Sequence, residues 1–250
     1  MQFAAFADRA AELEAEPADL ETVSLVAVLL RDAGDDIGTV ARFLQGRVFP
    51  GWDSRTMDVG PALCYEALAK AAGTNVTADD VEERLADEGE IGAVAANLDL
   101  GGQQGLGAFA AGGGEGSGAD DGPTLAEVDD ALREVAAAEG SGSEDTKLAT
   151  LFGLFSRVSD DEARYLARLV LGEMRLGVGE GTVRDAIAEV FAVDPGLVAD
   201  ALQVSNDYGR VARVARDEGS DGLQEMGLTV GRPVQSMLAQ AGTVTGALES

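Results

Sequence analysis

The chain has 250 residues and a formal net charge of −27, with 45 acidic residues against 18 basic ones. It contains no histidine and one cysteine, Cys64, which excludes histidine-based catalysis, histidine metal ligands and an internal disulfide. Its length supplies one large domain or two small ones, with ample material for a hydrophobic core.

Most of the chain predicts amphipathic helices, because apolar residues recur at spacings of three and four positions. Pro61 and Pro195 stand near helix starts, and Thr22 is predicted to cap the second helix. Four capping boxes are predicted at Thr77–Asp80, Thr124–Glu127, Ser159–Glu162 and Thr182–Asp185. The predicted helices cover residues 3–13, 22–33, 37–44, 60–72, 78–88, 90–99, 124–138, 144–158, 160–176, 182–192, 194–204 and 206–218.

Two segments interrupt this helical pattern. Residues 101–122 contain ten glycines in twenty-two positions, which is typical of a flexible surface loop or linker, because ordering such a chain costs much entropy. Residues 228–242 carry threonine, valines and a proline without a helical period, so an extended tail is expected there. The predicted fold class is all-α, with about 11–12 helices in two pseudo-related halves and a short extended C-terminal tail.

The basic residues are as unusual as the net charge. Only Lys70 and Lys147 are lysines, and all the others are arginines. A carboxylate surface with little lysine suits a cytosol at molar salt, where the Debye length is roughly 3 Å and self-repulsion is screened. We therefore prefer halophilic adaptation over an acidic partner-binding surface, and the net charge does not exclude nucleic acid. A soluble cytoplasmic protein is expected, because the sequence has no signal-peptide core and no run of eighteen apolar residues.

The charge is spread unevenly along the chain. Residues 76–145 hold 18 acidic and 2 basic residues, whereas residues 151–184 hold five of each. Residues 39–55 and 205–216 each have a net charge of +2. Three segments therefore escape the acidic bias, and this asymmetry is the first indication of function.

The stretch LGEMRLGVGEGTVRDA, residues 171–186, has three glycines at alternate positions. A dinucleotide-binding fingerprint needs a preceding strand and a P-loop ends in Gly-Lys-Ser/Thr, so neither motif fits. We expect Gly177 to end one helix in the left-handed conformation and Thr182 to cap the next. The free backbone amides of that next helix and of the glycines would then donate hydrogen bonds to a bound anion.

Arginines lead up to the same glycines. At 100° per residue, Arg164, Arg168 and Arg175 fall within about 40° of one another on the predicted helix 160–176. The alternative is an ordinary solvated face, but such faces of this chain are otherwise built from Asp and Glu. The stripe therefore indicates anion binding, and we favour a polyanionic duplex over a small phosphate ligand, since such contacts hold phosphates without reading bases.

Residues 143–191 resemble the DNA-binding domain of ATP-dependent DNA ligases of the archaeal type, with EARYLARLVLGEMRLGVGEGTV as the most specific part. FLQGRVFP at 43–50 and GRPVQSMLA at 231–239 agree with that family. The resemblance implies an all-helical domain over residues 1–222, followed at 228–250 by the start of the nucleotidyltransferase domain. It implies that the domain grips nicked double-stranded DNA through the minor groove on both sides of the nick, in replication, repair and recombination.

The resemblance also assigns site residues. By position, the DNA-binding candidates are Arg175, Gly177, Gly179, Gly181 and Thr182, with Arg164, Arg168 and Arg184 as weaker ones. Gln235 and Ser236 replace the basic residue and the proline more usual in GRPVQSMLA, so these two positions receive no role.

The family's adenylated lysine lies in a KxDG motif shortly after this segment, and neither Lys70 nor Lys147 is followed by Asp-Gly. We therefore expect an N-terminal piece of a ligase, with no catalytic residue, metal ligand or cofactor of its own. ATP and Mg²⁺ are implied for the full-length ligase, whose remaining catalytic domains become expected partners, close to the nucleoid and away from any membrane. A free-standing enzyme is the weakest alternative.

The glycine-rich segment contains QQGLGAF, residues 103–109. Gln103, Leu106 and Phe109 fit the recognition pattern of the sliding clamp (PCNA), in which two apolar side chains fill one pocket. Ala110 replaces the second aromatic residue, so a modest affinity is expected. The alternative function is accordingly a non-enzymatic helical adaptor that binds the sliding clamp, DNA or both.

Overall fold

The computed structural model describes residues 1–100 and 122–234. Within these ranges the chain forms thirteen α-helices, one 3₁₀ turn and no strand, which confirms the predicted all-α class. No helix of the described ranges is long and apolar enough to cross a membrane. The helices are α1 (Phe3–Ala15), α2 (Asp19–Asp32), α3 (Ile37–Phe43), α4 (Pro61–Ala72), α5 (Ala78–Glu88), α6 (Ile91–Ala96), α8 (Leu125–Ala137), α9 (Ser143–Phe155), α10 (Asp160–Val170), α11 (Glu180–Phe191), α12 (Pro195–Ser205), α13 (Tyr208–Asp217) and α14 (Gly219–Glu225).

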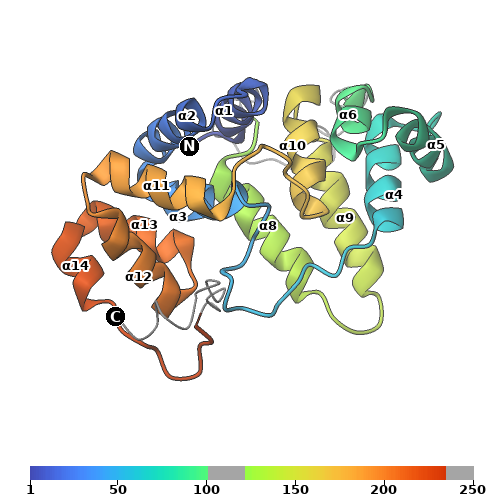
Figure 1. Cartoon of the computed structure of the whole chain (residues 1–250). Coiled ribbons are helices and arrows are strands. Elements are labelled where there is room, and N and C mark those ends of the chain that lie inside the picture. Colours follow the sequence, from blue (N-terminus) through green and yellow to red (C-terminus); the bar gives the residue numbers. More distant parts are fainter. Residues whose placement is uncertain (101–121, 235–250) are drawn as a thin grey trace, which may run out of the picture.

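The helices form two groups with α8 between them (Figure 1). In the first group, α2 packs against α11 and α3 packs against α13. In the second, α6 packs against α10 and α4 packs against α9. Each group thus combines helices from before and after residues 101–121, and α1 joins the groups because it contacts both α2 and α10.

One continuous hydrophobic core runs through both groups. Phe3 and Phe6 of α1 stack with ring centroids 5.9 Å apart, and Phe6 meets Phe43 of α3 edge to face at 6.0 Å. All three rings are fully buried, as is Phe155 of α9. Because burying each such ring contributes roughly 1.5–3 kcal/mol, this core fixes how the two groups sit relative to each other.

The capping boxes at Thr77–Asp80, Thr124–Glu127 and Ser159–Glu162 are confirmed. The predicted box at Thr182 is wrong, because α11 begins at Glu180 with Gly179 as an N-cap that lacks a side-chain cap bond. Glu180 suits this position, since a carboxylate in the first turn complements the helix dipole.

The end of α10 also differs from the prediction. The helix stops at Val170 rather than at residue 176, because Gly172 takes a left-handed φ of 71°. The Gly172 amide donates to the Leu169 carbonyl at 3.1 Å, and the Glu173 amide donates to the Arg168 carbonyl at 2.8 Å. These two bonds form a Schellman motif, so Gly172 and not Gly177 ends the helix.

Three smaller features also differ from the prediction or lie outside the described residues. Thr22 lies within α2 and donates its hydroxyl to the Ala18 carbonyl at 3.0 Å, so it is not a cap. Helix α14 had no predicted counterpart. The described part of the expected extended tail, residues 228–234, forms no strand, and residues 101–121 and 235–250 lie outside the described ranges.

Candidate nucleic-acid interface

Residues 44–60, here called the crossing segment, run from α3 to α4 across the lower side of the molecule and connect the two helix groups (Figure 1). A β-carbon added at Gly46 would lie 3.0 Å from the carbonyl oxygen of Gly172, and one added at Gly51 would clash with the side chain of Asn206. These glycines allow the close approach. The crossing segment therefore brings together the three segments that escape the acidic bias of the sequence.

Two arginines hold the crossing segment from its protein-facing side. Arg42 Nε and Arg133 Nη2 donate to the same Val48 carbonyl, at 3.0 and 2.9 Å. Both guanidinium groups also pair with Asp129, at 3.2 and 3.0 Å. Burial lowers the pKa of Arg42, and the charge of Asp129 opposes that shift. The conformation at Val48 is thus fixed by charge-assisted bonds, which are stronger than neutral ones.

Lys147 of α9 anchors the far end of the crossing segment. Its Nζ donates to the carbonyls of Met57 and Asp58, at 3.0 and 2.9 Å, and lies 3.4 Å from Asp58 Oδ2. Lys147 is buried, and Asp58 has a left-handed φ of 48°. Three oxygen atoms surround the ammonium, so Lys147 holds this end of the crossing segment in place and is not a free nucleophile.

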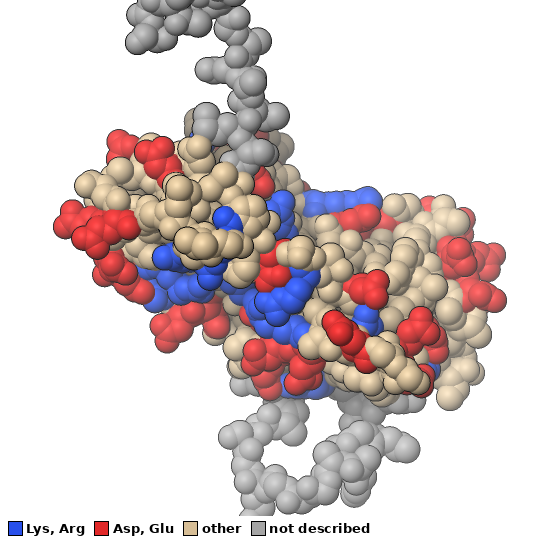
Figure 2. Space-filling model, turned by 90° about the horizontal axis from the view of Figure 1, so that it is seen from below, with Lys and Arg blue, Asp and Glu red and all other residues tan. Residues whose placement is uncertain are grey.

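Two grooves lie along the crossing segment. One, of 510 Å³, separates it from the end of α10 and is lined by Arg47, Arg55 and Gly172 among others. The other, of 580 Å³, separates it from the end of α8 and is lined by Arg55, Arg133 and Lys147 among others. Figure 2 shows Lys and Arg side chains gathered over the middle of the face seen from below, with Asp and Glu side chains beside them and at both ends.

Phe49 lies between two of these cations. The guanidinium carbons of Arg55 and Arg133 stand 4.5 and 5.1 Å from the centre of its buried ring. A cation over an aromatic face is attracted by about 0.5–1 kcal/mol at an exposed site and more when desolvated. Phe49 therefore keeps the two positive groups near each other despite their mutual repulsion.

The segment that carries Gly177, Gly179 and Gly181 at the start of α11, here called the glycine turn, has an unobstructed backbone. A β-carbon at Gly177, Gly179 or Gly181 would meet no protein atom within 4 Å, so the space beside each is open. Gly177 has the expected left-handed conformation, with φ of 69°. Arg175 has φ of 53°, a conformation that costs a non-glycine residue on the order of 1 kcal/mol. The uncapped first turn of α11 adds amides that suit an anion.

The predicted arginine stripe is wrong. Arg175 lies beyond the end of α10, and Arg168 is buried, with only 3% of its side chain exposed. Arg168 pairs with Glu14 of α1 at 2.8 Å and with Glu90 at 2.9 Å. Although burial opposes it, the hydrogen bonds that Arg168 donates to both carboxylates raise its pKa. Arg168 thus ties α10 to its neighbours, while Arg164 remains half-buried beside them.

The turn before α4 has the same pattern of residues and backbone conformation as the turn before α11. This repeat was not predicted from the sequence. In each, a left-handed residue, Asp58 or Gly177, is followed by a half-buried valine and a glycine N-cap. The signal was present in the letters DVGP and GVGE, each directly before a helix. The first copy is the poorer anion site, because Pro61 removes one amide and the Asp58 side chain is 91% exposed.

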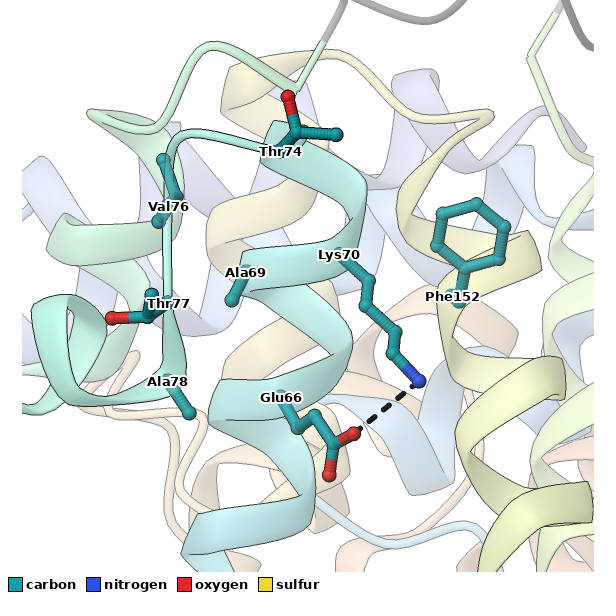
Figure 3. Close-up of a pocket in the computed structure, with 9 residues that line it drawn as sticks. Glu66, Ala69, Lys70, Thr74, Val76, Thr77, Ala78 and Phe152 are labelled. Carbon is teal, nitrogen blue, oxygen red and sulfur yellow. Dashed lines mark ion pairs between the residues drawn. The ribbon is translucent and has the colours of Figure 1, made fainter.

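Lys70, the second lysine, lies away from the crossing segment at the rim of a 410 Å³ pocket. Its ammonium pairs with Glu66 at 3.3 Å, and Figure 3 shows this pair on α4 with the ring of Phe152 across the pocket. The residues predicted to bind the sliding clamp, Gln103, Leu106 and Phe109, lie outside the described ranges.

Comparisons with known proteins agree with the resemblance. The family described as DNA ligase N terminus matches residues 2–188. The DNA ligase of Haloarcula marismortui is 66% identical over 249 residues, which cover 100% of this chain and 44% of that protein. The DNA ligase of Haloferax volcanii is 62% identical over 275 residues, with 99% and 46% covered. The chain therefore spans just under half the length of these haloarchaeal relatives, whose source organisms agree with the halophilic interpretation of its charge.

Proposed function

Because the chain belongs to the family of DNA ligase N-terminal domains, we propose that it is the DNA-binding part of an ATP-dependent DNA ligase. In this proposal it grips nicked duplex DNA through the minor groove, and the whole ligase seals the nick during replication, repair and recombination. The observation that carries the proposal is the convergence of three non-acidic segments around the crossing segment, seen in the close approaches of Gly46 to Gly172 and of Gly51 to Asn206.

The physical chemistry of this face supports phosphate binding at high salt. Affinity that depends on counterion release falls steeply as salt rises, so directional hydrogen bonds must contribute more at molar KCl. Exposed arginines at Arg55 and Arg175 offer charge-assisted bonds, and the glycine turn offers backbone amides beside open space. Such contacts fix the position of a duplex without reading its sequence.

ATP and Mg²⁺ belong, in this proposal, to the remaining domains of the ligase. Among the described residues, no three Asp, Glu, Cys or His side chains are grouped so that they could hold a metal ion. Lys70 and Lys147 are both engaged by oxygens of neighbouring residues. No step of the function proposed for this chain passes through ATP or Mg²⁺.

The test is binding of a fluorescein-labelled nicked duplex at molar KCl, followed by anisotropy. Arg175→Glu should weaken binding about tenfold or more, because it removes a charge-assisted bond and adds repulsion. Arg84→Glu on α5 is the matched control, since Arg84 is also exposed but lies far from the crossing segment. Equal affinities for wild type and Arg175→Glu would contradict the proposal, as would an equal loss in the control.

A second function, binding of the sliding clamp, is proposed from the pattern of Gln103, Leu106 and Phe109. In a pull-down with the clamp, wild-type protein should be retained and Phe109→Ala lost, because the aromatic plug is removed. Retention of both proteins would contradict clamp binding through this motif.

A further inference from the structure

Four exposed arginines surround the crossing segment and the glycine turn, and each is held by a carboxylate. The pairs are Arg47–Glu180 at 3.5 Å, Arg55–Asp53 at 2.6 Å, Arg175–Glu173 at 2.8 Å and Arg184–Asp185 at 2.7 Å. In three of them the partners are one or two positions apart in the sequence. The candidate interface is therefore built from arginines that carry their own local anions.

These pairs do little for the fold. The four arginine side chains are 40–64% exposed, and exposed ion pairs contribute a median of about 0–1 kcal/mol. Pairs formed between such close neighbours in sequence do not connect distant elements. Structural pairs in this chain look different, as in the buried contacts of Arg168 with Glu14 and Glu90.

The Arg55–Asp53 pair is the most developed of the four. Asp53 accepts from the backbone amide of Arg55 at 3.0 Å and from Nε and Nη2 of its guanidinium. The Asp53 side chain is only 8% exposed, whereas that of Arg55 is 64% exposed. Asp53 keeps the bond from the Arg55 amide when the guanidinium turns away, and the exposed guanidinium is free to reach a phosphate.

We infer that a DNA backbone binds this face by exchange, in which phosphate oxygens replace the carboxylates of Asp53, Glu173 and Asp185 on their arginines. This inference rests on the proposed function and specifies how its site works. Each phosphate that is neutralised releases a condensed cation, and each carboxylate that is displaced takes one up. The net release of cations is therefore smaller than the number of arginine–phosphate contacts.

The exchange gives binding that tolerates salt. When Z free cations neutralise phosphates of duplex DNA, log K falls with log[salt] with a slope of roughly −0.9Z. Cation uptake by displaced carboxylates makes the slope of log K against log[salt] less negative. Because the carboxylates compete with phosphate for the arginines, the affinity at lower salt is also reduced. An acidic protein built in this way loses less affinity over the molar range, in which its surface charge is screened, than one whose arginines have no local carboxylates.

The test compares two triple variants with the same change in net charge. The first, Asp53→Asn/Glu173→Gln/Asp185→Asn, removes the three local anions. The second, Glu83→Gln/Glu189→Gln/Asp200→Asn, changes exposed acids that have no ion pair with an arginine among the described residues. Affinity for a labelled nicked duplex is measured from 0.5 to 3 M KCl, with circular dichroism at each point to verify the fold.

The first variant should bind more tightly than wild type at 0.5 M KCl, with a slope steeper by about 2–3, because three arginines regain full cation release. Across the salt range it should lose about a hundredfold more affinity than wild type. The control variant should keep the wild-type slope. Should the first variant unfold, Glu173→Gln alone, at an exposed position, should steepen the slope by about 1.

The outcomes separate the two proposals. Wild-type protein that fails to bind duplex DNA at any salt contradicts the proposed function itself. Wild-type binding with an unchanged slope in the first variant, or with equal steepening in the control, overturns the exchange and leaves the proposed function standing.

Discussion

Lys147 stands in a chain that uses arginine almost everywhere else, and its contacts explain why a lysine is retained there. Its ammonium meets two backbone carbonyls and one carboxylate oxygen around a single nitrogen. A compact group with three rotatable donors fits that arrangement, whereas a planar guanidinium does not. The same contacts hold Asp58 in its left-handed conformation two positions before the glycine that caps α4.

These contacts predict the stabilities of variants at Lys147. Lys147→Met should lower the free energy of unfolding by about 1–3 kcal/mol, because two inward-facing carbonyls lose their donor. Lys147→Arg should also lower the free energy of unfolding, since the planar guanidinium does not fit the site. Adding Asp58→Gly should recover part of the loss, because glycine adopts the positive φ without help. Urea unfolding at constant molar KCl measures this, and a Lys147→Arg protein as stable as wild type would contradict it.

At the scale of the helices, Arg168 fastens α10 to α1 and α6. Its hydrogen bonds hold the pKa of Glu14 below the ordinary value, and they also lower the pKa of Glu90 against the effect of burial. A carboxylate whose pKa is lowered on folding stabilises the protein above its unfolded pKa, and that stability is lost as the pH falls through the folded pKa. The contribution of these two groups is therefore present near neutral pH and disappears in acid.

Arg168→Met should consequently change the pH dependence of stability as well as its size. Near pH 7 the variant should be several kcal/mol less stable, because two carboxylates then face each other without a cation. Below pH 4 the difference should shrink, since wild type loses the same interaction on protonation. Urea midpoints at pH 7 and pH 3.5 test this, and a difference that stays constant between the two would rule out the proposed coupling.

The helices also show which features the sequence could predict. Capping boxes depend on residues three positions apart, and the patterns at Thr77, Thr124 and Ser159 predicted them correctly. The same pattern at Thr182 failed because α11 already begins at Glu180. The end of α10 was missed because Met174 and Leu176 are buried and continue the apolar pattern beyond Gly172, where the helix stops. Local periodicity cannot separate a buried loop from a further helical turn.

At the scale of the whole molecule, the sequence indicated which segments are non-acidic but not that they meet. Their convergence depends on α3 packing against α13 and on the course of the crossing segment, and both are contacts between residues distant in sequence. The arginine stripe failed for the same reason, because the partners of Arg168 lie 154 and 78 positions away. The glycine turn, a local feature, kept its expected open backbone.

The most direct measurement is hydrogen–deuterium exchange of the protein at molar KCl, with and without a nicked duplex. We expect slower exchange on DNA binding in residues 44–60 and 172–184, because bound phosphates and the exclusion of solvent protect amides of the crossing segment and the glycine turn. We expect no change in α5, at the far end of the second helix group. Protection confined to other segments, or none in either of these two while the duplex is bound, would contradict the account.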